Sequence, residues 1–91
     1  MLLRQMSLKT IMNADWSDYD KRKISEGSNI HHFRSGEPWE IDYLVDKITH
    51  EYPTITHIAV RSAIAICCVT IDGPHPRSLF VACILEYLGL Y

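Results

Sequence analysis

Prolines divide the C-terminal three-fifths of this 91-residue chain into three apolar stretches. The stretches cover residues 39–52, 55–71 and 79–91. The prolines at their edges are Pro38, Pro53, Pro74 and Pro76. Proline fixes φ and has no N–H, so it is tolerated in the first turn of a helix or just beyond its end. The pattern predicts an all-α fold with three main helices, at about residues 38–51, 56–71 and 76–88.

The first of these helices has the clearest pattern. Pro38 stands at the first helical position, and an acidic side chain follows at Glu40, where the helix dipole favours negative charge. The apolar residues then recur at offsets of 0, 3, 4, 7 and 11, which places them on one helical face. They are Ile41, Leu44, Val45, Ile48 and Tyr52. The sequence therefore predicts an amphipathic helix that ends before Pro53.

The second stretch, residues 55–71, allows two interpretations. Its length exceeds that of the usual strand, and Gly73 followed by Pro74 is typical of a helix end, so a helix is favoured. Either Thr54 or Thr56 can cap its start. The many β-branched residues, followed by Asp-Gly, would also suit a buried strand that enters a turn. Helix and strand both stay open at this point.

Residues 1–36 differ in composition from the rest of the chain. Aliphatic residues are few between residues 14 and 36, and no helical stripe can be drawn, so we predict a largely irregular N-terminal arm with a short helical turn near residues 17–24. Trp16, Tyr19 and Phe33 are the exceptions that can pin the arm to the body. The predicted organisation is an arm over residues 1–36, partly disordered or docked, and a helical domain over residues 37–91. Met12 is an alternative start, which would make residues 1–11 an extension.

Composition and charge predict a soluble protein with no membrane span. Hydrophobic residues make up 47% of the chain, but Arg61 and Ser62 interrupt the most apolar stretch before it reaches membrane-spanning length. The formal net charge of −2 gives no general attraction to polyanions. The opening residues lack the apolar core and cleavage site of a secretory signal. Three cysteines, all within apolar stretches, are typical of reduced, buried thiols, and we expect a cytoplasmic protein.

The histidines and cysteines do not have the spacing of a metal site or a catalytic site. There is no C-x-x-C pair, and on a helix Cys67 and Cys68 would point about 100° apart. A nucleophilic pairing of Cys67 or Cys83 with His75 lacks the positive neighbours that activate a thiol. We therefore expect no metal, no cofactor and no enzymatic activity.

A basic cluster in the arm suggests one class of partner. The candidate phosphate contacts are Lys21, Arg22, Lys23 and Arg34. Nearby aromatic rings can stack on the bases of a single strand, but acidic residues interleave with the cations. A groove-reading helix needs Arg, Lys, Asn or Gln on its surface, and the predicted second and third helices offer almost none. A nucleic-acid-associated regulator that uses residues 21–34 is the alternative function.

The favoured function follows from surplus apolar surface on the second and third helices. The residues of the third helix form two different stripes, which one small core cannot bury together, and surplus of this kind usually marks an interface. The candidate interface residues are Val81, Leu85, Leu88, Leu90 and Tyr91. We expect a small protein-interaction or regulatory module, a homodimer through these faces. The competing interpretation is that the arm folds back through Trp16 and Phe33 and covers the surplus.

Overall fold

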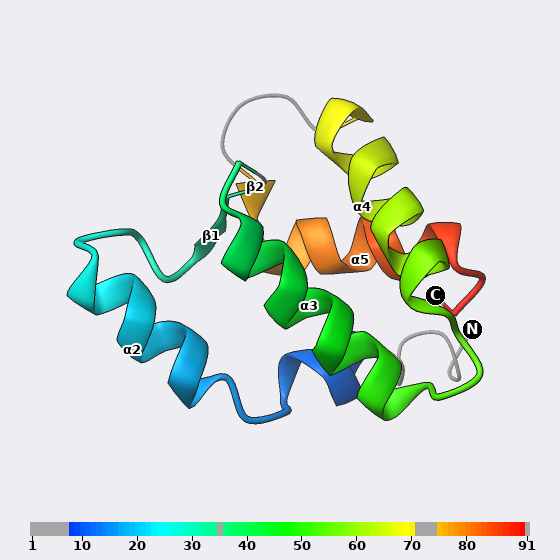
Figure 1. Cartoon of the computed structure of the whole chain (residues 1–91), viewed down its shortest axis with the longest axis horizontal. Helices are drawn as coiled ribbons and strands as arrows, with labels where there is room; N and C mark the ends of the chain where they lie inside the picture. The colour runs from blue at the N-terminus through cyan, green and yellow to red at the C-terminus, as the bar shows by residue number, and fades with distance from the viewer. Residues whose placement is uncertain (1–7, 35, 71–74, 91) are drawn as a thin grey trace.

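The structure is a computed structural model that describes residues 8–34, 36–70 and 75–90 (Figure 1). Its elements in chain order are α2 (Ser17–Ser25), β1 (His32–Phe33), α3 (Pro38–Glu51), α4 (His57–Thr70), β2 (His75–Pro76) and α5 (Arg77–Tyr87). Residues 8–12 are also helical. Helices carry almost all of the regular structure in the described residues, so the prediction of an all-α protein is confirmed in outline.

The helices of the body follow the proline pattern. Pro38 begins α3, which ends at Glu51, and its predicted stripe supplies the buried residues Leu44, Val45 and Ile48. The segment for which helix and strand stayed open is the helix α4. The hydroxyl oxygen of Thr56 accepts a hydrogen bond from the Ala59 N–H at 3.1 Å, which caps the start of α4 as predicted.

The count of three helices and the irregular arm need correction. The arm contains the nine-residue helix α2, whose buried residues are Tyr19 and Lys23. Neither residue is aliphatic, so a search for aliphatic stripes passes over this helix. The helical residues 8–12 add a further turn, in which Ile11 is fully buried. Helix therefore accounts for about half of the described part of the arm.

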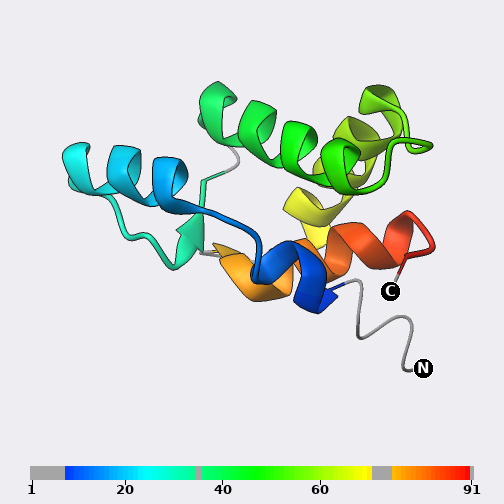
Figure 2. The same ribbon diagram turned by 90° about the horizontal axis from the view of Figure 1, so that it is seen from below.

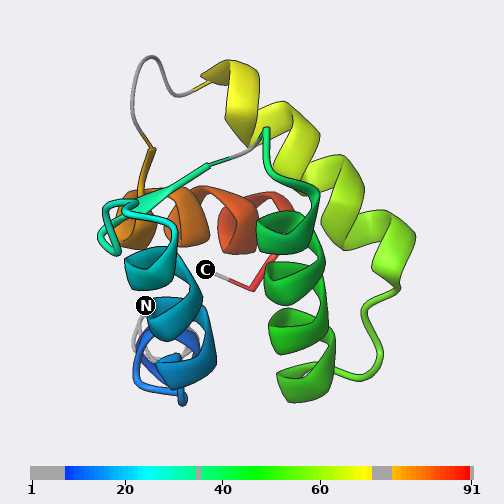
Figure 3. The same cartoon turned by 60° about the vertical axis from the view of Figure 1, so that its left-hand side comes forward.

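A short antiparallel ladder joins the arm to the chain before α5. His32 pairs with Pro76, and Phe33 pairs with His75. The Arg77 N–H extends this contact by donating to the His31 carbonyl at 2.8 Å. Because Pro76 belongs to β2, α5 begins one residue later than predicted, at Arg77. The ladder holds the end of the arm beside the start of α5, as the turned view in Figure 3 shows.

The core combines residues from both sides of the predicted boundary at residue 36. The Phe33 ring stacks on the Phe80 ring with centroids 4.6 Å apart, and Trp16 is buried beside Tyr19. Residues 8–12 run alongside α5, and Ile11 belongs to the same buried cluster (Figure 2). The arm therefore packs against the body as an integral part of the core. Among the described residues, no helix combines the length and apolarity needed to cross a membrane.

Candidate functional site

Lys23, a predicted phosphate contact, lies inside the protein. Its side chain is 0% exposed, and its Nζ donates to both carboxylate oxygens of Glu40, at 3.1 and 3.0 Å. It also donates to the His32 carbonyl oxygen at 2.8 Å. The prediction for this residue was wrong, because a fully enclosed cation with three acceptors cannot reach a phosphate in solution.

Glu40 is the centre of this buried polar network. Its Oε1 accepts hydrogen bonds from the Tyr19 hydroxyl at 2.6 Å and from the Arg34 backbone N–H at 3.0 Å. Burial, followed by the hydrogen bond to Glu40 and its negative charge, raises the pKa of Tyr19 well above its usual range. Tyr19 therefore stays protonated and donates to the carboxylate. The network ties α2, β1 and α3 together.

The other cations of the arm do not converge on one surface. Arg22 lies 3.7 Å from the Glu26 carboxylate, and its guanidinium covers the Trp39 ring at 4.3 Å. Arg34 faces a different region, where its Nη1 donates to the Ser28 hydroxyl at 3.2 Å. Lys21 is exposed on α2. Trp16, Tyr19 and Phe33 are buried, so they are not available to stack on bases.

The predicted interface residues of α5 are mainly core residues. Val81 is 1% exposed and Leu85 is 0% exposed, while Leu88 and Leu90 are half-buried. Tyr91 lies outside the described residues. Val81 and Leu85 are thus unavailable to a partner, contrary to the prediction, because both belong to the buried core, to which the arm contributes Trp16 and Phe33. The sequence left both interpretations open, because neither depends on a local pattern that the other lacks.

The two most exposed of the large apolar side chains lie on α4, and Leu79 and Tyr87 of α5 are exposed to a lesser degree. Ile58 is 77% exposed and Val69 is 81% exposed, and Ile66 is also at the surface. The sequence pattern placed Ile66 and Val69 on a second stripe of this helix, but their exposure depended on which stripe the core would use. The structure buries the other one, which contains Val60, Ala63, Ile64 and Cys67.

Two of the three cysteines form a disulfide, which corrects the expectation of reduced thiols. Cys67 of α4 is joined to Cys83 of α5, with the two Cα atoms 6.1 Å apart. Cys68 is free and half-buried. The expectation failed because a pairing across 16 residues and two helices leaves no local spacing signal.

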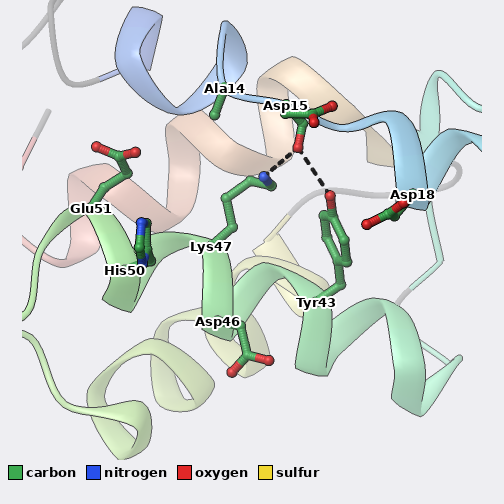
Figure 4. A pocket seen from close by; sticks show the side chains of 8 residues that line it. All are labelled: Ala14, Asp15, Asp18, Tyr43, Asp46, Lys47, His50 and Glu51. Carbon is green, nitrogen blue, oxygen red and sulfur yellow. Dashed lines mark hydrogen bonds between the residues drawn. The ribbon is translucent and has the colours of Figure 1, made fainter.

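An open cleft of about 380 Å³ lies between α3 and the turn before α2 (Figure 4). Lys47 and Tyr43 point to the same atom, the Asp15 carbonyl oxygen, with donor distances of 2.6 and 3.2 Å. The Asp15 carboxylate accepts from Ser17, and hydrogen bonds from the Ser17 side chain and backbone lower its pKa. Three polar residues of this cleft, Asp15, Tyr43 and Lys47, therefore fasten the arm to α3. We assign it a structural role.

A second cleft, of about 340 Å³, lies where the turn after α2 meets β2. Its polar lining residues are Ser28, Asn29, His32, Arg34 and His75. Gly27 begins it with a φ of 71°, a left-handed conformation that glycine adopts without strain and that reverses the chain after α2. The sequence analysis identified Arg34 as a candidate phosphate contact. It could not place residues 28–34 beside His75, because their proximity depends on the β1–β2 ladder.

No set of three or more His, Cys, Asp or Glu side chains is placed to hold a metal ion within residues 8–34, 36–70 and 75–90. Comparison of the chain with protein-family models, curated proteins and solved structures gives no match.

Proposed function

We propose that this protein is a small, non-enzymatic interaction module that associates with a second copy of itself through the outward face of α4. The observation that carries the proposal is the exposure of Ile58 and Val69, two large apolar side chains at opposite ends of one helical face. Burying such a side chain contributes about 1.5–3 kcal/mol, and each would contribute once per copy.

The residues between them complete a symmetric pattern. Ser62 and Ala65 are exposed, and they follow Ile58 at offsets of 4 and 7, with Val69 at 11, so the four share one face. The order along the helix is large, small, small, large, and it is centred between residues 63 and 64. Small residues at the centre let two helices approach closely, while the large ones close the ends.

This pattern fits an antiparallel pair of α4 helices about a two-fold axis. The axis would place Ile58 against Val69 of the second copy, and Ser62 against Ala65 of the second copy. Arg61 would then face Ile66 of the second copy rather than the matching arginine, so no like charges are opposed. A two-fold pair is the commonest closed arrangement of identical chains. We therefore favour a second copy as the partner.

The proposal is tested by measuring solution mass by sedimentation velocity over about 1 to 100 µM protein. We expect a dimer for the unmodified chain and a monomer for Ile58→Glu/Val69→Glu, because two buried carboxylates without partners would oppose association. Ile24→Glu is the matched control, since Ile24 is an exposed isoleucine on α2 with 66% exposure. A monomeric unmodified chain, or equal dissociation of the Ile24→Glu variant, would overturn the proposal.

The contacts of the arm disfavour the alternative of a nucleic-acid-associated regulator. Its cations are dispersed, Lys23 is enclosed, and the aromatic rings that would stack on bases belong to the core. Nothing in the described residues favours it over association through α4.

A cytoplasmic location stays a prediction from the sequence. The Cys67–Cys83 disulfide argues against it, because stable disulfides persist mainly in oxidising compartments. The interaction proposed for α4 does not depend on the compartment.

A further inference from the structure

The cleft between the turn after α2 and β2 is lined by cationic and neutral side chains that can donate hydrogen bonds. Arg34 contributes a guanidinium, Ser28 a hydroxyl, Asn29 a side-chain amide, and His32 and His75 contribute imidazoles. No carboxylate belongs to its described lining. Donors without a competing carboxylate favour an anionic ligand.

The buried carboxylate of Glu40, which accepts from the Arg34 backbone N–H, is already paired with Lys23. Glu40 accepts from Lys23, Tyr19 and the Arg34 backbone N–H, so its charge is shared among internal donors. The Arg34 guanidinium forms one long ion pair, with Nη2 4.0 Å from Glu37 Oε1, and Glu37 does not line the cleft. The Arg34 side chain is 56% exposed and is available to a ligand.

His75 supplies an independent observation within the same wall. It is 9% exposed, its ring packs on Phe80 with centroids 4.9 Å apart, and its Nδ1 has no hydrogen-bond partner among the described residues. A buried polar atom without a partner costs free energy, and in native proteins such atoms usually pair with a water molecule or a ligand.

We propose that this cleft binds a small phosphate dianion, either free phosphate or a phosphomonoester. Arg34 would hold the phosphate oxygens by charge-assisted hydrogen bonds, Ser28 and Asn29 would donate from the turn, and His32 and His75 would complete the wall. The site is separate from the α4 face, and it stands or falls independently of self-association.

The compactness of the donor set favours a single phosphate group over a nucleic-acid strand. A strand needs cations along its path, but Arg22 is engaged with Glu26 and Trp39, and Lys23 is enclosed. The donors of the cleft instead come from one turn and one short ladder. They surround one small volume.

The test is an NMR titration of the histidine ring signals of the full chain at constant ionic strength. The probes are inorganic phosphate, glycerol 3-phosphate and a short single-stranded oligonucleotide without a terminal phosphate, with chloride as the reference anion. We expect phosphate and glycerol 3-phosphate to shift the His32 and His75 signals and to leave His50 and His57 unchanged. The tighter of these two ligands identifies the natural source of the group.

Arg34→Gln should weaken phosphate binding about tenfold or more, because it removes a charge-assisted contact. The substitution keeps the Arg34 backbone N–H that Glu40 needs, so the fold is retained. Arg22→Gln is the matched control, since its side chain is 55% exposed on the same arm, and it should bind as the unmodified protein does. Unchanged His32 and His75 signals, equal loss in both variants, or tighter binding of the oligonucleotide would overturn the proposal.

Discussion

At the scale of single residues, the most consequential contact is the ion pair between Lys23 and Glu40. Both side chains are fully enclosed, and 17 residues separate them in the chain. Enclosing two charges is costly, and their attraction offsets the cost only when further hydrogen bonds satisfy them. Tyr19, the Arg34 N–H and the His32 carbonyl provide those bonds. The pair therefore specifies where α2 sits on α3.

Glu40→Gln tests this role, because the amide keeps an acceptor for Tyr19 and leaves the Lys23 charge unpaired. We expect it to lower the free energy of unfolding by about 3–5 kcal/mol, measured by urea denaturation. In a Lys23→Met background the same substitution should cost less than half as much, since no charge is then stranded. A cost below about 1 kcal/mol in the unmodified background would contradict this account.

Tyr19 makes the free energy of unfolding depend on pH in the alkaline range. Its pKa is raised in the folded protein, so between the ordinary tyrosine pKa of about 10 and the raised value the unfolded chain loses this proton while the folded chain keeps it. The folded state then binds more protons, and the free energy of unfolding should fall as pH rises above about 10. For Tyr19 alone the slope approaches about 1.4 kcal/mol per pH unit.

This pH dependence is measured by urea denaturation at several pH values between 9 and 11. Tyr19→Phe should flatten the slope, although part of it remains because burial also raises the pKa of Tyr43. An unchanged slope in Tyr19→Phe would show that Tyr19 is not responsible.

At the scale of elements, the disulfide between Cys67 and Cys83 joins two helices that already pack together. It links α4 to α5 and closes a loop of 16 residues. A cross-link of this span restricts the unfolded chain, and for a 15-residue loop the stabilisation is about 3 kcal/mol. The α4 face therefore belongs to a helix that is fixed covalently as well as by packing.

Cys83→Ser should lower the free energy of unfolding by about 3 kcal/mol relative to the oxidised protein. Cys68→Ser is the matched control and should change it by less than about 1 kcal/mol, because Cys68 is free and half-buried. Equal effects of the two substitutions under oxidising conditions would argue against a stabilising cross-link.

The helices differ in how well they can be predicted from the sequence. The start and end of α3 could be predicted because Pro38 and Pro53 bracket an aliphatic stripe. For α2 a short helical turn near residues 17–24 could be predicted, but its length and buried face could not, because a tyrosine and a lysine form that face, and lysine faces inward only when a carboxylate meets it. That carboxylate, Glu40, belongs to another helix. Propensity and periodicity are local, whereas this face is created by a tertiary contact.

At the scale of the whole molecule, the same limit decides the candidate sites. Surplus apolar surface could be recognised from the sequence, but Val81 and Leu85 are buried in the core while Ile58 and Val69 are left exposed. Arg34 could be marked as a cation, but its neighbour His75 is distant in sequence and is brought to it by the ladder. Which surface remains free depends on the position of every element, including one whose face has no aliphatic pattern.

The ladder between β1 and β2 also affects the order in which the protein can form during synthesis. Two arm residues have partners that are synthesised late. Phe33 stacks on Phe80, and the Asp20 carboxylate accepts a hydrogen bond from the Arg77 guanidinium at 2.9 Å. Because α5 follows every other helix in the chain, the arm emerges from the ribosome well before these partners exist. The Phe33 ring then lacks its stacking partner until α5 follows, which leaves apolar surface of the nascent chain exposed during that interval.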